Sequence, residues 1–209
     1  MELIKNLKWR YATKQFDPSK KVSQENLDKL KKAVQLSVSS YGLQLYKVLI
    51  VENRAIRERL KEASWGQNQI TDASHLFVFC NYTNVKDKDV DHYIELSART
   101  QNIKIDVLNG YGDFMKEKIN DMESNEQQHW TKRQTYLALA NLLNACAESK
   151  IDACPMEGFE AEKYNDILGL ADKGLSAAVI ATVGYRSQND TSQFRKKVRK
   201  PLSELFEEL

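Results

Sequence analysis

The stretch 176–183, Ser-Ala-Ala-Val-Ile-Ala-Thr-Val, is almost free of polar side chains and ends at Gly184. Two more apolar runs precede it, YKVLIVE at 46–52 and HLFVFC at 75–80, and both are rich in β-branched and aromatic residues. Runs of this length and composition are typical of buried strands. A shorter run, ACPMEGF at 153–159, predicts a strand that leads into a turn. The candidate strands lie far apart along the chain.

Helical spacing of apolar residues fills the segments between these runs. It predicts a helix over 27–36 with Ser23 as its N-cap, another over 54–63, and a long, largely buried helix over 128–150. A short helix is expected over 160–168. Few strands, widely spaced and separated by helices, predict an α+β or three-layer α/β fold.

The composition is that of one ordered unit. Apolar residues make up 42% and charged residues 29%, and no Pro/Gly/Ser-rich linker divides the chain, so we expect a single domain over 1–209. A formal net charge of +2 argues against binding to nucleic acids or to membranes. The three cysteines form no CxxC pair and no signal peptide is visible, which predicts a cytoplasmic protein with reduced thiols.

Two basic pairs lie at opposite ends of the chain, Arg10 with Lys14 and Lys197 with Arg199. Guanidinium and ammonium groups donate charge-assisted hydrogen bonds to phosphate oxygens, so the four together could hold a mononucleotide phosphate. Taken pair by pair, solvated surface charge is the simpler interpretation. Neither a GxGxxG fingerprint nor a P-loop is present, so a nucleotide would have to be bound in another way.

The segment Pro-Met-Glu-Gly-Phe at 155–159 is a second candidate, because Gly158 lets the backbone approach a flat ring closely. From spacing alone, an ordinary turn is the simpler interpretation. The three histidines lack metal-ligand spacing and no GxSxG elbow occurs. We therefore expect no metal site and assign no catalytic side chain.

Five motifs in order resemble the nitroreductase family. RYATKQFD at 10–17 resembles the family's opening motif, and SVSSYGLQ at 37–44 its Ser-Pro-Ser-Ser-x-Asn-x-Gln loop. TDASH at 71–75 resembles its Asp-Ala-Ser-His segment, PMEGF at 155–159 its Pro-[Ile/Met]-Glu-Gly-Phe turn, and KVRKP at 197–201 its Lys-x-Arg-x-Pro. The resemblance spans nearly the whole chain and points to the branch of oxygen-insensitive NAD(P)H nitroreductases and dihydropteridine reductases.

The resemblance implies a three-layer α/β/α fold with a central, mostly antiparallel sheet flanked by helices, in an intertwined homodimer. It also implies FMN as the cofactor and NADH or NADPH as the electron donor. The FMN-binding residues that it implies are Arg10, Tyr11, Ala12, Lys14, Ser39, Ser40, Gln69, Pro155, Met156, Glu157, Gly158, Lys197 and Arg199.

Some of these assignments carry specific roles. The loop of Ser39 and Ser40 would come from the other subunit, and Gln69 would touch the pyrimidine edge of the flavin. Gly42 stands where the family usually has Asn. Aromatic side chains expected to line the substrate pocket are Tyr41, Phe114 and Trp65.

The activity implied is FMN-dependent oxidation of NAD(P)H, coupled to reduction of nitroaromatics, quinones, pterins or flavins by ping-pong hydride transfer. A flavin-binding sensor or storage protein on the same fold is the alternative, because fold alone does not fix function. Nucleic-acid binding by the basic segment 195–200 is a weaker interpretation, since the net charge is nearly neutral.

Overall fold

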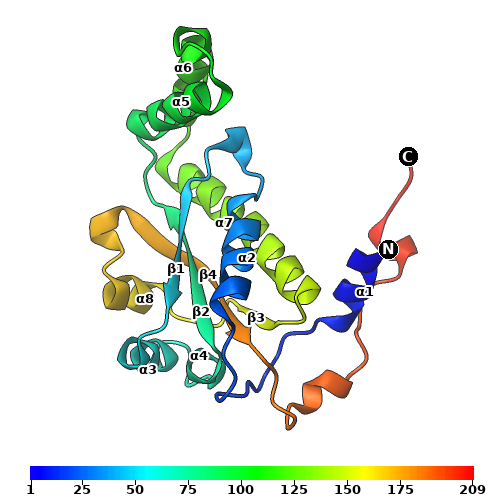
Figure 1. The fold of residues 1–209 in the computed structure, drawn as a ribbon. Helices are drawn as coiled ribbons and strands as arrows, with labels where there is room; N and C mark the ends of the chain where they lie inside the picture. The colour runs from blue at the N-terminus through cyan, green and yellow to red at the C-terminus, as the bar shows by residue number, and fades with distance from the viewer.

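The computed structural model describes residues 1–209. At its centre is a four-stranded antiparallel sheet with strand order β1-β2-β4-β3 (Figure 1). The strands are β1 (Tyr46–Val51), β2 (His75–Tyr82), β3 (Asp152–Met156) and β4 (Leu175–Gly184). Each of the four apolar runs forms a strand, as predicted, but β1 lies at the edge of the sheet and only Val51 of it is buried, so the predicted burial of this strand is wrong.

Nine α-helices accompany the sheet, and the predicted ones are among them. They are α1 (Glu2–Trp9), α2 (Gln24–Gln35), α3 (Arg54–Glu62), α4 (Gln69–Asp72), α5 (Asp87–Gln101), α6 (Asp106–Asn120), α7 (Ser124–Glu148), α8 (Ala161–Leu168) and α9 (Leu202–Leu205). Short 3₁₀ helices are η1 (Ser40–Gly42), η2 (Ala171–Lys173) and η3 (Thr191–Phe194). The Ser23 hydroxyl accepts a hydrogen bond from the Asn26 N–H at 3.2 Å, which confirms the predicted cap of α2.

Helices cover both faces of the sheet. Successive side chains of a strand point to opposite faces, so a strand that is apolar throughout needs packing partners on both sides. Val78 of β2 packs in one core with Leu60 of α3 and Tyr164 of α8. Its neighbour Phe77 packs in the other core with Leu142 of α7. The predicted α+β fold, with helices on both faces of an antiparallel sheet, is confirmed.

The helix α7 connects distant parts of the molecule (Figure 1). Near its C-terminal end, Glu148 accepts a hydrogen bond from Asn6 of α1. Farther toward its N-terminus, Gln134 accepts one from the backbone N–H of Ser40 at 2.8 Å, and Trp130 packs in a third core with residues of α5 and α6. No helix is both long enough and apolar enough to cross a membrane.

The two ends of the chain lie together. After β4 the chain passes through η3 and returns beside α1 (Figure 1). There the ammonium group of Lys197 donates hydrogen bonds to the carbonyl oxygens of Leu7, at 2.8 Å, and of Arg10. Residues almost two hundred positions apart in sequence therefore form one surface.

Candidate functional site

A cavity of about 500 Å³ lies where the chain ends meet, and we call it the cationic cavity. Its volume is in the range of sites for small molecules. The basic residues that line it are Lys8, Arg10, Lys14, Arg195, Lys196, Lys197 and Arg199. The other lining residues are Trp9, Tyr11, Ala12, Pro155, Ser192 and Gln193, so no acidic side chain faces the cavity.

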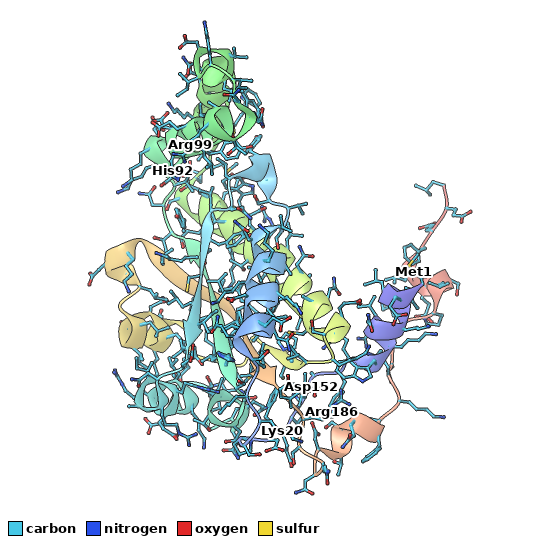
Figure 2. The ribbon with its side chains drawn as sticks, in the orientation of Figure 1. Met1, Lys20, His92, Arg99, Asp152 and Arg186 are labelled. Atoms are coloured by element: carbon cyan, nitrogen blue, oxygen red, sulfur yellow. The ribbon has the colours of Figure 1, made fainter.

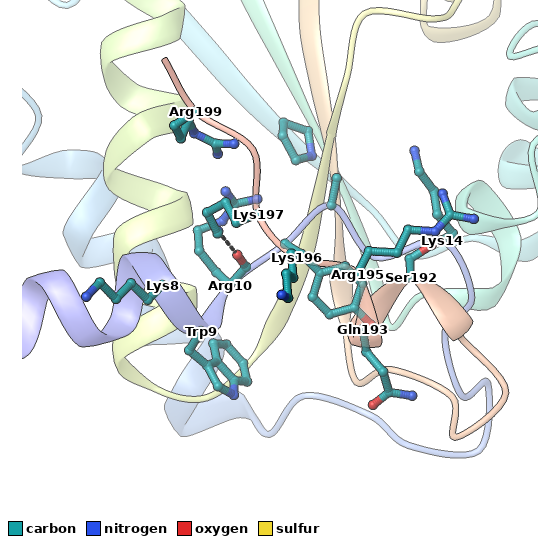
Figure 3. A pocket seen from close by; sticks show the side chains of 13 residues that line it. Lys8, Trp9, Arg10, Lys14, Ser192, Gln193, Arg195, Lys196, Lys197 and Arg199 are labelled. Carbon is teal, nitrogen blue, oxygen red and sulfur yellow. Dashed lines mark hydrogen bonds between the residues drawn. The ribbon is translucent and has the colours of Figure 1, made fainter. Parts of the chain in front are cut away.

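The four predicted phosphate-binding cations all line this cavity. Figure 3 shows Lys197 and Arg199 next to Arg10 on one side, with Lys14 on the other. The hydrogen bond from Lys197 to the Arg10 carbonyl joins the two halves of the cluster. The structure therefore brings together two basic pairs that sequence spacing alone could not connect.

The positive charges in the cavity destabilise the protonated forms of neighbouring basic side chains. Partial burial lowers the pKa of Arg10, and the positive charge of Arg199 lowers it further. Burial also lowers the pKa of Lys197, with further contributions from Arg10 and Arg199. A bound anion would relieve this repulsion, because opposite charge nearby favours the protonated forms.

Asp190 holds the loop after α1 in place from outside the cavity. Its carboxylate accepts hydrogen bonds from the backbone N–H groups of Lys14, at 2.8 Å, and Ser192, at 3.0 Å, and from the Tyr11 hydroxyl at 3.0 Å. Burial alone raises the pKa of Asp190, but these hydrogen bonds outweigh it and the pKa lies below its usual range. Asp190 thus stays ionised and fixes the backbone around Lys14.

The predicted FMN-binding residues at the end of β3 and in the turn after it lie in different parts of the structure. Pro155 lines the cationic cavity, whereas Met156 is buried in the core. Glu157 accepts a hydrogen bond from the Tyr136 hydroxyl of α7 at 2.5 Å. Burial, followed by this hydrogen bond, raises the pKa of Tyr136 to about 12.

Gly158 lies against a flat aromatic ring. A Cβ added at Gly158 would lie 2.8 Å from the Trp65 ring, so any larger residue would clash with it. The Gly158 carbonyl accepts a hydrogen bond from Gln67 at 2.8 Å. The flat ring that lies at Gly158 in this structure is that of Trp65, and the contact with a flavin ring stays a prediction.

The remaining predicted cofactor residues do not line the cationic cavity of their own chain. Gln69 is buried in α4. The Ser39 hydroxyl accepts from the Gln44 N–H at 2.9 Å, and Ser40 is held by Gln134. The predicted substrate residues also separate: Tyr41 and Phe114 pack edge to face at 6.4 Å, whereas Trp65 lies at Gly158.

Comparison with known proteins identifies the family. The model of the nitroreductase family matches residues 7–185. The chain belongs to the nitroreductase family.

Individual nitroreductases agree with this assignment. An NAD(P)H nitroreductase of Haemophilus influenzae is 34% identical over 94% of this chain and 91% of its own. A solved Bacillus subtilis nitroreductase has a TM-score of 0.88 at 20% identity, covering 100% and 99% of the two chains. An Exiguobacterium sibiricum nitroreductase, solved in complex with FMN, has a TM-score of 0.85 at 14% identity and covers 100% and 98%. All three names carry the qualifier "putative".

The structure explains why this nitroreductase has Gly42 in place of the usual Asn. Gly42 has a φ of +79°, a conformation that favours glycine. A Cβ there would lie 2.8 Å from the hydroxyl of Tyr93 on α5. The Tyr93 ring occupies the space that a Cβ would need, so a larger residue at position 42 would require this ring to shift.

Sequence reasoning missed two important residues of this nitroreductase, Asp152 and Arg186. The Arg186 Nε donates to a carboxylate oxygen of Asp152 at 2.8 Å, and the pair lies directly beneath the loop that carries Arg10. The pairing of the two predicted strands could have indicated this contact, because β3 and β4 are antiparallel and Asp152 lies opposite Gly184. Antiparallel pairing of the two predicted strands would have placed Asp152 near Arg186.

The cysteines take no part in the cationic cavity. Cys80, Cys146 and Cys154 are all buried free thiols, as expected. Burial raises the pKa of Cys80 to about 12, so its thiol stays protonated. No group of three or more His, Cys, Asp or Glu side chains is arranged to hold a metal ion.

Proposed function

We propose that this chain is an FMN-dependent NAD(P)H oxidoreductase. One observation carries the proposal: Arg10, Lys14, Lys197 and Arg199 line a single cavity that contains no acidic side chain. Such a set of donors suits a phosphate dianion, since Arg binds it through two hydrogen bonds and Lys as a point charge. The name of the H. influenzae relative supports the nicotinamide donor, and the FMN complex of the E. sibiricum relative supports the cofactor.

The residues present fit FMN in charge and shape. The four cations would hold its phosphate, and the backbone at Gly158, which the Trp65 ring covers here, would face its ring system. When bound, FMN takes up a hydride from NADH or NADPH and passes electrons to an acceptor. The chain's own contribution is to place the ring, keep positive charge nearby and exclude water. No side chain is assigned as acid or base.

The proposed order of reaction is ping-pong. The nicotinamide leaves before an acceptor enters the same pocket, so one open site serves both substrates. Nitroaromatics, quinones, pterins and flavins are the proposed acceptors, with Trp65 of one chain and Tyr41 and Phe114 of a second copy as the aromatic walls. Trp65 is 68% exposed and Phe114 45%, so both rings are available for contact.

We further propose that the enzyme is a homodimer in the cytoplasm. Ser39 and Ser40 do not line the cavity of their own chain, so they would complete that of a second copy. The last residues of the chain expose large apolar side chains, with Val198 at 84% and Leu202 at 75%, and a second copy would cover them. Buried free thiols agree with a reducing compartment.

Two measurements test the proposal. The purified protein should show flavin absorbance bands near about 370 and 450 nm, a property of the bound cofactor itself. It should then oxidise NADH or NADPH in steady state with menadione or nitrofurazone as acceptor. A yellow protein that neither nicotinamide reduces would favour the flavin-storage alternative, and a protein that binds no FMN would overturn both.

A further inference from the structure

Arg186, two residues after β4, lies between two aromatic rings. Its guanidinium carbon is 4.6 Å from the centre of the Trp9 ring and 4.6 Å from that of the Tyr11 ring. A guanidinium group stacks favourably on aromatic faces, so this one cation holds both rings. We call Arg186, Asp152, Trp9 and Tyr11 the Arg186 clamp.

Asp152 fixes the orientation of Arg186 within the clamp (Figure 2). Its carboxylate accepts hydrogen bonds from the Arg186 backbone N–H and Nε, both at 2.8 Å, and a terminal guanidinium nitrogen lies 2.5 Å away. Asp152 is only 5% exposed, so water competes little for this carboxylate. The Arg186 guanidinium is paired with Asp152 and lies close to two rings, and it does not line the cationic cavity.

The clamp holds both sequence neighbours of Arg10. Trp9 ends α1 and Tyr11 begins the following loop, so the backbone of Arg10 is fixed on each side. The Arg10 carbonyl in turn accepts a hydrogen bond from Lys197. Two of the four cations of the cavity therefore take their positions from the segment that Arg186 holds.

We propose that Arg186 is a positioning residue that aligns Arg10 with the phosphate of FMN and thereby sets a preference for FMN over riboflavin. The inference rests on the proposed function, because it requires a flavin phosphate in the cationic cavity. Arg186 does not line the cavity, so it would act on the phosphate through Trp9 and Tyr11.

The test is the affinity of Arg186→Lys for FMN and for riboflavin, measured by quenching of flavin fluorescence. Lysine keeps the charge but loses the planar fork and the stacking faces. We expect the Kd for FMN to rise about tenfold and that for riboflavin to change less than about twofold, because only the phosphate contact is misplaced. Arg99→Lys is the matched control, since this exposed arginine lies on α5, far from the clamp (Figure 2).

A second arm asks whether Arg186 acts through Arg10. In an Arg10→Ala background, Arg186→Lys should weaken FMN binding less than it does in the wild type, because one of the two cations that it positions is absent. Equal losses for FMN and riboflavin, or an undiminished loss in the Arg10→Ala background, would overturn the positioning role.

The outcomes separate this inference from the function on which it rests. If the wild-type chain binds FMN and riboflavin equally, the phosphate site itself is wrong and the clamp has no role in it. If the wild type prefers FMN and Arg186→Lys keeps that preference, only the clamp is wrong. Should Arg186→Lys fold poorly, Trp9→Leu removes one stacked ring but keeps the ion pair with Asp152. The same selective loss of FMN is expected, and an unchanged preference would overturn the inference.

Discussion

The cationic cavity and the loop at 39–42 lie beside the same helix, α7, but at different heights. The cavity adjoins α1, which is anchored at Glu148, whereas Ser40 is anchored at Gln134. An α-helix rises 1.5 Å per residue, so the two anchors are about 20 Å apart. The family resemblance predicts that both regions bind FMN, with the loop at 39–42 reaching the cofactor of the other subunit.

The two regions differ in whether a single chain supplies all the side chains that the predicted site needs. The cavity gathers seven basic side chains from both ends of a single chain. Polar groups of the loop at 39–42 form hydrogen bonds with Gln44 and Gln134, and none of its residues lines the cationic cavity. One chain can thus supply all the cations for the phosphate of a cofactor, while a second copy supplies the residues that contact the remainder of that cofactor. This is the arrangement that we propose here.

The largest expected effect is a loss of stability caused by a substitution in α7, the helix that anchors both regions. Leu142 of α7 is fully buried in the core, so Leu142→Ala should lower the free energy of unfolding by about 3 kcal/mol through lost contacts and a cavity. Urea denaturation measures this loss. Leu137→Ala, at a 43% exposed position of the same helix, is the control and should change stability little. A loss in Leu142→Ala no greater than in the control would contradict the role of α7.

The next effect separates the two regions. Arg10→Ala should weaken FMN binding by about 1.5–3 kcal/mol, the scale of a hydrogen bond to a charged group. Riboflavin affinity should be unchanged, because riboflavin lacks the phosphate. Equilibrium titration followed by flavin fluorescence measures both, and Lys5→Ala at an exposed position of α1 is the control. Unchanged FMN affinity would falsify the phosphate assignment of the cavity.

A smaller effect is expected in the loop at 39–42. Gly42→Asn restores the usual residue of the family but brings a Cβ against Tyr93, so we expect a fall in melting temperature of about 3 °C, equivalent to about 1 kcal/mol. Tyr93→Phe removes the clashing hydroxyl and should recover part of the loss in the double variant. A double variant no more stable than Gly42→Asn would show that the strain has another source.

An effect of similar size depends on pH and concerns the loop beside the cavity. Because the pKa of Asp190 is lowered on folding, its carboxylate stabilises the fold above the ordinary Asp pKa, and this contribution is lost as the pH falls through the lowered value. Asp190→Asn should therefore be less stable than wild type by about 1 kcal/mol at pH 7. The difference should shrink below about pH 4 in urea titrations. A difference that stays constant with pH would contradict the role of the charge.

Much of the fold followed from local patterns. The run 176–183 and its counterparts form strands because β-branched and aromatic residues pack well on a pleated sheet that helices cover. Ser23 capped α2 because its hydroxyl satisfies a free backbone N–H. The hairpin of α5 and α6 gave no comparable signal, since residues such as Val107 and Phe114 remain exposed in the single chain.

The candidate site was predictable only in its components. The motif at 10–17 and the one at 197–201 named the cations, and the structure showed that they share a cavity. Nothing in either motif indicated that Arg186 stacks between Trp9 and Tyr11. That contact depends on the position of the C-terminal end of β4 relative to the end of α1.

The sequence by itself determined the strands, the main helices and the chemistry of the cations, because periodicity and side-chain type act over a few residues. The tertiary structure decided that Lys197 reaches Arg10, that Asp152 and Arg186 support them, and that Ser40 stays apart. These outcomes depend on strand order and helix packing. Such contacts join residues that only the folded chain brings within reach of one another.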